Sequence, residues 1–528
     1  MSFHRVNGSR SALQCGQVKL EGQQMSECEV CGRRMHAEPV LNGSKLSVST
    51  PSYIFTTRTQ TTAIGLRIYS EFYCPSCGPE PRELAMLALL ALLLLCHGVR
   101  DSDGSTAHFY AGDMLSLLDF KRAITDDPNG VLNSWNRSTP FCSWTGVTCS
   151  RAHPGRVAAL DLVGQELKGE ITPSLLGNLT FLRTLSLSTN GFSGPLPALN
   201  RLGKLEVLDL RDNTLHGTIS DTLVNCSNLN RLYLSTNSFV GEIHPKLGLL
   251  SSLLFLVLYE NQLTGTIPPT LCNMTHLEGI VLDDNNLSGS IPTELGKLSN
   301  LSWLILRENS FMLGGVDNKF LGHIPDSVGN FSKLEEIDLS DNTISGQVPG
   351  AFGRLQKLSC LILGANVIEA SNKQSWEFLH ALKNCTLLNI LFLSDNKLEG
   401  VIPNSIGNLS VNLQYLFLGG NHLLGVVPPS IRSLHNLTVL ALENNDLTGT
   451  LEGWIGGLTN IQNLRLHANN FIGTIPPSVG NLQQLTNLDL SQNNLDGDIP
   501  SNMGNIGQLQ RLDLRNNKLR AISPCLPV

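Results

Sequence analysis

Residues 253–268 read LLFLVLYENQLTGTIP, and close copies recur, such as LEVLDLRDNTLHGTI from Leu205 and LTNLDLSQNNLDGDIP from Leu485. The shared pattern is LxxLxLxxNxLxGxIP, and nine of the fourteen intervals between its asparagine positions, that of Gln165 included, are 24 residues long. A fixed period of this length indicates a solenoid of stacked repeats. Residues 157–519 hold fifteen copies, with Gln165 at the asparagine position of the first and the following residues in the others: Asn190, Asn213, Asn237, Asn261, Asn285, Asn309, Asn342, Asn366, Asn396, Asn421, Asn445, Asn469, Asn493 and Asn517.

Each position of the repeat has a physical role. The LxL triplet predicts a short strand with both leucines inside, and stacked copies make a parallel sheet with strands about 4.8 Å apart. The asparagine can satisfy backbone groups where the chain turns away, and the proline can begin a short helical segment. The GxIP form resembles the plant class of leucine-rich repeats. The expected fold is an α/β solenoid, a leucine-rich-repeat superhelix with a parallel concave sheet and short helical or 3-10 segments on the convex side.

Composition and motifs argue against several functions. Of the 528 residues 41% are hydrophobic, which is too many for a disordered chain, and the net charge of −7 does not suit a general nucleic-acid binder. The sequence contains no GxxxxGK, HRD, DFG, GxSxG or HExxH motif. We therefore expect a protein that binds another molecule and is not an enzyme.

Residues 113–150 form a different segment ahead of the repeats. Asp113 can cap a helix whose apolar residues face one side, and CSWTGVTC follows at residues 142–149. The first copy of a solenoid has an open apolar edge that needs a cover. The helix, together with Trp135 and Trp144, can supply this cover.

This segment resembles the N-terminal cap of plant leucine-rich-repeat receptor kinases and related receptor-like proteins. The resemblance implies a disulfide between Cys142 and Cys149, and a disulfide implies an oxidising compartment. Asn-x-Ser/Thr sequons agree with that location, although an asparagine-rich repeat also generates sequons by composition alone. The ten predicted glycosylation sites are Asn136, Asn178, Asn225, Asn273, Asn286, Asn300, Asn330, Asn384, Asn408 and Asn436.

The region before the cap does not fit this plan. Residues 84–98 contain the apolar run LAMLALLALLLLC, which suits a signal-peptide core and is too short for an ordinary membrane span. Residues 1–83 precede it and hold two CxxC pairs that could bind zinc as thiolates, Cys28 with Cys31 and Cys74 with Cys77. We expect the mature protein to begin between Gly98 and Asp113 and to need no cofactor. The alternative is a zinc-binding leader followed by a signal anchor.

Two of the intervals between the repeat asparagines are clearly longer than 24 residues. Asn309 to Asn342 carries a Gly-rich stretch without a pattern, for which a functional loop and a gene-model error are both open. Asn366 to Asn396 carries WEFLHALKNCT, whose spacing predicts a helix in which Trp376 packs inward.

That insertion, with the following NSIGNLSVNLQYLFLGGNHLLGVVP, is similar to ectodomains of the receptor-kinase subfamily that senses bacterial proteins in plant immunity. Members of that subfamily continue into a membrane helix and a Ser/Thr kinase, whereas this chain has a tail at residues 520–528. We expect a truncated ectodomain, to which the kinase activity does not carry over.

Residues between and beside the strand leucines point out of the sheet, and their character changes along the array. Most are polar in the first and last three copies and apolar in the middle. Exposed aromatic patches usually mark recognition surfaces, while β-propensity alone also places aromatics in strands. The predicted ligand-binding residues are Tyr233, Phe255, Val257, Tyr259, Val281, Trp303 and Ile305 in a first patch, and Ile362, Ile390, Phe392, Tyr415 and Phe417 in a second. A polar rim is expected from Glu260, Asp283, Asp284, Arg307 and Glu308.

These features predict a secreted or cell-surface module that binds a peptide or protein in plant defence or developmental signalling. A co-receptor kinase is a further expected partner, nucleic acid is not, and a membrane would be reached only through the family's membrane helix. Two alternatives stay open. One is a soluble inhibitor of a pathogen cell-wall hydrolase, similar to the plant proteins that block polygalacturonases. The other is a truncated product without a function of its own.

Overall fold

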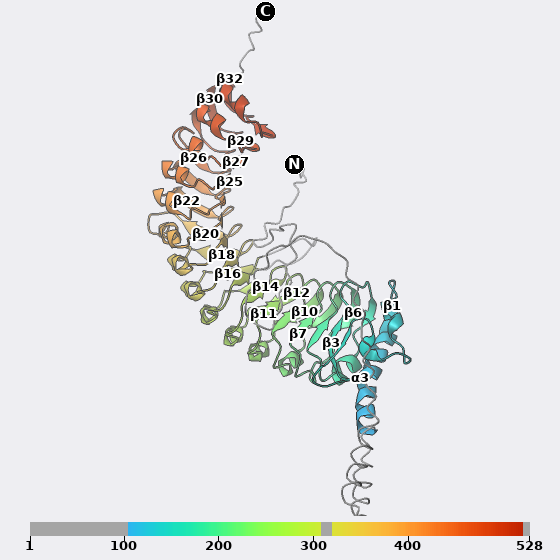
Figure 1. Cartoon of the computed structure of the whole chain (residues 1–528). Helices are drawn as coiled ribbons and strands as arrows, with labels where there is room; N and C mark the ends of the chain where they lie inside the picture. Colours follow the sequence, from blue (N-terminus) through green and yellow to red (C-terminus); the bar gives the residue numbers. More distant parts are fainter. Residues whose placement is uncertain (1–103, 308–318, 521–528) are drawn as a thin grey trace, which may run out of the picture. The chain divides into compact units, whose positions relative to one another are not determined.

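The computed structural model describes residues 104–307 and 319–520, with side chains from residue 112 onward. The cap and the repeats lie in one compact unit, Ala107–Val528. The leader, the signal-like segment, all four CxxC cysteines, the tail from residue 521 and the rim residue Glu308 lie outside the described residues. Figure 1 shows the strands along one side of the array and the short helical segments along the other.

The fifteen LxL triplets and β2 of the cap form one sheet of sixteen strands, parallel from β3 onward, with β2 antiparallel to β3 at its start. We call its outward surface the concave face. Its strands in order are β2 (Val147–Cys149), β3 (Val157–Asp161), β5 (Thr184–Ser186), β7 (Val207–Asp209), β9 (Arg231–Tyr233), β11 (Phe255–Val257), β13 (Gly279–Val281), β15 (Trp303–Ile305), β17 (Glu336–Asp338), β19 (Cys360–Ile362), β21 (Ile390–Phe392), β23 (Tyr415–Phe417), β25 (Val439–Ala441), β27 (Asn463–Arg465), β29 (Asn487–Asp489) and β31 (Arg511–Asp513).

The NxLxGxI segments form further strands. Twelve of them pair with β1 of the cap in one sheet of thirteen strands, where β1 is antiparallel to β4 and the others are parallel, and three more pair separately near the C-terminal end of the array. The thirteen are β1 (Ile124–Asp126), β4 (Lys168–Glu170), β6 (Gly191–Pro195), β8 (Thr214–Thr218), β10 (Ser238–Glu242), β12 (Gln262–Gly265), β14 (Asn286–Gly289), β16 (Lys319–Gly322), β18 (Thr343–Gly346), β20 (Val367–Ala370), β22 (Lys397–Val401), β24 (His422–Val426) and β26 (Asp446–Thr448). The three are β28 (Ile472–Thr474), β30 (Asn494–Asp498) and β32 (Lys518–Arg520).

Short helical segments return the chain from this second strand to the next LxL strand. The GxIP proline stands one residue before the segment and not inside it, as Pro292 does before η6 with φ −62° and ψ 131°. The segments are α4 (Pro173–Asn178), η3 (Asp221–Asn225), η4 (Pro245–Leu249), η5 (Pro269–Asn273), η6 (Thr293–Lys297), η7 (Asp326–Asn330), η8 (Gly350–Arg354), α5 (Glu377–Ala381), η9 (Leu382–Asn384), η10 (Asn404–Asn408), η11 (Pro429–Ser433), η12 (Ile455–Gly457), η13 (Pro477–Asn481) and η14 (Ser501–Asn505).

The repeat asparagines join neighbouring copies, as the sequence predicts. Asn366 is 7% exposed and is typical of the interior positions. Its Nδ2 donates to the carbonyl oxygens of Leu339, Leu363 and Gly364, and its Oδ1 accepts from the amide of Ile344. Each such side chain therefore satisfies backbone groups of its own copy and of the copy before it, which regular strand pairing leaves without partners.

The N-terminal cap covers the first copy with aromatic side chains. Helix α3 (Gly104–Ala123) and the 3-10 segments η1 (Val131–Ser134) and η2 (Phe141–Ser143) belong to it. The rings of Trp135 and Trp144 stack with centroids 5.5 Å apart, and Phe120 stacks on Phe192 of the repeat array at 5.7 Å. The implied disulfide is present, between Cys142 and Cys149.

One prediction about the cap is wrong, namely that Asp113 caps the helix. Helix α3 begins at Gly104, so Asp113 lies inside it. Its carboxylate is buried, forms an ion pair with Arg156 at 3.1 Å and accepts the backbone amide of Val157 at 2.8 Å. These contacts fix the cap helix to β3, because a buried carboxylate has to find such donors.

The insertion of copy nine forms α5 (Glu377–Ala381), as its spacing predicts. Trp376 is 4% exposed, stacks on Phe378 at 5.8 Å and donates its Nε1 hydrogen to the carbonyl oxygen of Glu399. The prediction that Trp376 packs inward is therefore confirmed.

Candidate ligand-binding face

The first apolar patch is continuous across four strands of the concave face. Tyr233, Val257, Val281 and Ile305 stand in register on β9, β11, β13 and β15. All four are half-buried. They point out of the sheet, whereas the apolar strand residues before and after each of them point into the core. Together with Phe255, Tyr259 and Trp303 they make one surface, which we call the aromatic stripe.

A glycine at the centre of the stripe leaves room for two aromatic rings to meet. Phe255, Gly279 and Trp303 are register partners on three successive strands, and the two rings meet with centroids 5.9 Å apart. A Cβ atom on Gly279 would lie 2.9 Å from the Phe255 ring and 3.4 Å from the indole of Trp303. The absent side chain thus lets two aromatic rings from strands two apart come together above the sheet.

Trp303 is the most open aromatic residue of this surface. It is 37% exposed and is the one aromatic side chain among the large exposed hydrophobic residues of the described ranges. A half-open indole over an apolar sheet offers a large rigid contact area to a partner.

Cations border the stripe on its N-terminal side. The guanidinium of Arg211 lies 4.8 Å from the ring centre of Tyr233, and that of Arg231 lies 5.7 Å from the ring centre of Phe255. Arg211 also forms an ion pair with Asp209 at 2.7 Å. These contacts hold the rings in place from one end.

Carboxylates border the stripe on its C-terminal side. Glu336 is the register partner of Trp303 and Asp338 that of Ile305. Burial, reinforced by the charge of Asp338, raises the pKa of Glu336 to about 7. Burial, reinforced by the charge of Asp284, raises the pKa of Asp283 to about 7, and burial with the charge of Glu260 raises that of Asp284 to about 6. Sequence reasoning placed Asp283 and Asp284 in the rim but missed Glu336 and Asp338.

The second patch offers less surface than the sequence indicated. Ile362, Ile390 and Phe417 are 8%, 4% and 5% exposed, so the expectation that they are open is wrong. The Phe392 ring lies 4.9 Å from that of Phe417 and over Gly364, where a Cβ would meet it at 2.0 Å. The side chains therefore lie flat on the sheet and cover one another. Tyr415 and Phe392 remain half-buried.

A polar cluster further along the face holds basic and acidic side chains that face each other. Arg465 lies 3.3 Å from Glu443, and His467 lies 3.2 Å from Asp489. Oε2 of Glu443 and Nε of Arg465 are buried without a hydrogen-bond partner.

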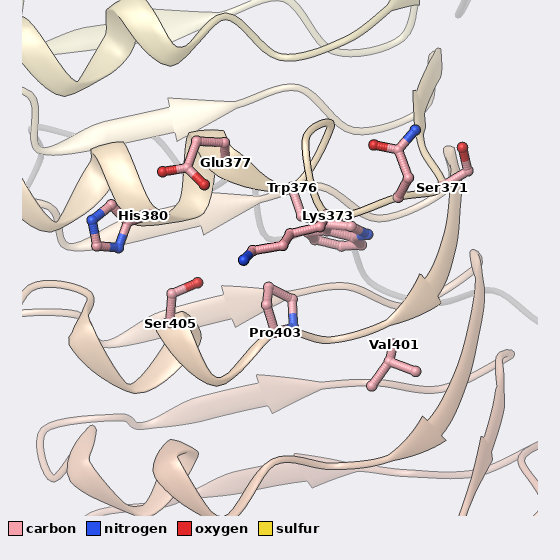
Figure 2. A pocket seen from close by; sticks show the side chains of 9 residues that line it. Ser371, Lys373, Trp376, Glu377, His380, Val401, Pro403 and Ser405 are labelled. Carbon is pink, nitrogen blue, oxygen red and sulfur yellow. The ribbon is translucent and has the colours of Figure 1, made fainter.

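A cavity of about 610 Å³ lies beside the insertion of copy nine. Figure 2 shows the Lys373 amine extending between Glu377 and His380 on one side and Ser405 on the other. Its lining residues come from α5, η10, β22 and the loop before α5, and none belongs to the sixteen-stranded sheet.

The predicted glycosylation sites follow the helical side of the array. Six of the ten occupy the last residue of a helical segment and are exposed there: Asn178, Asn225, Asn273, Asn330, Asn384 and Asn408. Asn300 and Asn436 follow such segments, Asn286 begins β14, and Asn136 lies in the cap. None of the ten lies on a strand of the concave face, so glycans at these positions would leave that face open.

In the part of the chain that the structure describes, we find no helix with the length and apolar character needed to span a bilayer.

Family models agree with this architecture. A leucine-rich-repeat N-terminal domain matches residues 111–150, and a leucine-rich-repeat model matches residues 411–471. A single-repeat model matches six further segments, at residues 204–226, 252–274, 276–298, 333–355, 387–409 and 484–506.

Relatives and solved structures are similar to parts of the chain. The receptor-like serine/threonine-protein kinase EFR of Arabidopsis thaliana is 47% identical over 94 residues, which are 18% of this chain and 9% of that protein. Phytosulfokine receptor 1 of the same species is 32% identical over 115 residues, 22% of this chain and 11% of that protein. The chain thus matches about a tenth of the length of these relatives.

Two solved structures share the fold over most of the array. The plant peptide hormone receptor RGFR1, solved in complex with RGF2, is 34% identical with a TM-score of 0.63, covering 69% of this chain and 56% of that one. The TDR receptor is 31% identical with a TM-score of 0.62, covering 68% of this chain and 60% of that one. The chain is therefore a leucine-rich-repeat protein with an N-terminal cap, and its relatives are the leucine-rich-repeat receptor-like kinases of plants.

Proposed function

We propose that this chain is an extracellular recognition module that binds an extended peptide, or a protein segment of that shape, on the aromatic stripe. Such a module would serve defence or developmental signalling at the cell surface, alone or with a co-receptor kinase. Its resemblance to a peptide hormone receptor solved with RGF2 supports this proposal. The predicted glycosylation sites support it too, because they lie away from the concave face.

The contrast within the repeating sheet carries the proposal. Outward positions of the sheet have similar packing demands, and Asp161, Ser186 and Asp489 show that polar residues satisfy them. The stripe nevertheless keeps apolar residues on four successive strands and an indole that is 37% exposed. An apolar patch in water risks aggregation, which a surface without a partner has no reason to retain. At about 4.8 Å per strand the four strands span about 15 Å, enough for a few extended residues of a peptide.

We expect Trp303→Ala and Tyr259→Ala each to weaken peptide binding by more than about 1 kcal/mol, because each removes a large contact at the centre of the stripe. The probe is a phage-displayed library of random peptides selected on the secreted full chain. Enriched peptides are then synthesised, and their dissociation constants are measured by calorimetry.

Ser186→Ala is the control, since Ser186 points out of the same sheet on β5, outside the stripe, at the position that Ile305 occupies on β15. Thermal unfolding of all variants checks that the fold is intact. Enriched peptides that bind both stripe variants as tightly as the control would place the site elsewhere and leave the aromatic residues as strand formers.

A further inference from the structure

Among the described residues beside the aromatic stripe, carboxylates outnumber cations. The strands and turns of copies five to eight carry six acidic side chains, and the guanidinium of Arg307 acts on four of them. We call these six residues the acidic cluster: Glu260, Asp283, Asp284, Glu336, Asp338 and Asp341. Arg307 lies 3.8 Å from Asp341. Its charge opposes the rise in the pKa of Asp283, Asp284 and Asp338, but burial outweighs it and all three pKa values are raised.

One member of the cluster has an oxygen atom without a partner. Oδ1 of Asp283 is buried and accepts no hydrogen bond in the described structure. Buried polar atoms in native proteins almost always have a partner, and an orphaned acceptor is a reason to look for a missing donor. The polar cluster further along the face also has buried atoms without a hydrogen-bond partner, Oε2 of Glu443 and Nε of Arg465, but there the carboxylate and the guanidinium face each other at 3.3 Å.

The stripe and the cluster meet at Trp303. The indole lies on β15 directly beside Glu336 on β17, and Ile305 lies beside Asp338. An apolar surface that ends in carboxylates suits a side chain with an apolar stem and a cationic end. The exposed indole also attracts such a cation through its ring face.

We propose that the acidic cluster binds the side chain of an arginine or lysine residue in the peptide that occupies the aromatic stripe. The stem of that residue lies against Trp303 and Ile305, and its cationic end donates hydrogen bonds to Glu336, Asp338 and the orphaned oxygen of Asp283. This inference rests on the proposed function and adds the chemical class of the ligand residue that the site selects.

The proposal is tested with Asp338→Asn and its matched control. Asp338 accepts the amide and the hydroxyl of Ser340, at 2.9 and 2.6 Å. Asp489 makes the same two bonds to Ser491, at 3.0 and 2.7 Å, in the equivalent position of copy fourteen. Asparagine keeps the acceptor oxygen in both. Asp338→Asn removes a buried charge that belongs to the acidic cluster, whereas Asp489→Asn removes a half-buried charge that faces His467 outside it.

Peptides enriched on the wild-type chain are expected to contain a basic residue, and its replacement by uncharged citrulline or norleucine should weaken binding at least about fivefold. Asp338→Asn and Glu336→Gln should weaken binding of the basic peptide by a similar factor, and Asp489→Asn should not. Neither acidic-cluster variant should affect the uncharged peptide.

The outcomes separate this inference from the proposed function. Peptides that lack a basic residue, yet lose affinity in Trp303→Ala, would leave the recognition module standing and overturn the acidic cluster as its cation site. Equal binding by Asp338→Asn and Asp489→Asn would overturn it as well. A library that yields no peptide above an empty-surface control would overturn the recognition module itself.

The same site predicts how binding depends on pH. Burial raises the pKa of Asp283 and Glu336 to about 7 and that of Asp284 to about 6, so all three gain charge between pH 5 and 8. A bound cation favours their ionised forms, and the groups that face them are Glu260, Arg307, Asp338 and Asp341. Affinity for the basic peptide should therefore rise as the pH increases from 5 to 8, while affinity for its citrulline analogue stays level. A basic peptide that binds best at pH 5 would contradict this.

Discussion

Replacing Cys142 with serine is expected to lower the free energy of unfolding of the cap by about 2–5 kcal/mol, the usual cost of removing a native disulfide from a small secreted domain. The bond closes a loop between residues whose Cα atoms are 5.5 Å apart. Within that loop lies Trp144, which is 2% exposed and stacks on Trp135. Loosening the loop would therefore also free an indole that covers the first repeat.

The measurement is thermal unfolding combined with amide hydrogen exchange on the secreted protein. In a repeat array each copy contacts only its neighbours, so the loss should appear first in the cap and in β3 and should fade along the sheet. The double variant Cys142→Ser, Cys149→Ser controls for mispairing of the remaining thiol and should behave like the single one. Mass spectrometry that finds both thiols free in the wild-type protein would contradict the prediction.

The fold could be predicted almost completely because the same sequence pattern recurs in every copy, and each recurrence predicts the same local structure. Leucines at fixed offsets are buried and the asparagines join adjacent copies, since a position that recurs so often has one packing environment. The features that were not predicted occur once each. Asp113 was assigned to a helix end, because its distant partner Arg156 is visible only after folding.

The candidate site could be predicted in part, for a similar reason. Alternation along each strand identified the outward residues of the stripe. It could not show that Gly279 lets Phe255 and Trp303 touch, because that contact depends on three strands in register. Nor could it show that Phe417 is covered by its neighbours, or that Glu336 and Asp338 lie at the end of the stripe. Such features depend on which side chains meet across strands, and the alternation within one strand carries no information about those contacts.

The repeat asparagines form a series of hydrogen bonds between copies, which we call the asparagine ladder. The first copy shows what happens where the asparagine is missing. Gln165 takes the asparagine position in copy one, and its Nε2 donates to the carbonyl oxygen of Val163 alone. The backbone amides of Gln165 and Leu167 are satisfied instead by Asn190 of the next copy. The first position can differ because the cap, and not another repeat, lies before it.

Replacing Asn366 with alanine is expected to lower the stability of the central copies by at least about 2 kcal/mol, because buried groups left without hydrogen bonds each cost about 1–3 kcal/mol. The variant would leave the Ile344 amide without an acceptor, and the carbonyl oxygens of Leu339, Leu363 and Gly364 would each lose a donor. The side chain is 7% exposed, so water cannot replace these bonds without opening the stack.

Asn517→Ala is the matched control at the other end of the array. Asn517 makes the same four bonds, to the amide of Leu495 and the carbonyl oxygens of Leu490, Leu514 and Arg515. Its side chain is only half-buried, so solvent can take over the lost bonds and the cost should be much smaller. Amide exchange provides the local measurement, with the Ile344 amide losing protection in Asn366→Ala and the Leu495 amide changing less in Asn517→Ala. Equal costs at the two positions would show that burial does not set the strength of the ladder, and that stacking of the leucines alone holds the copies together.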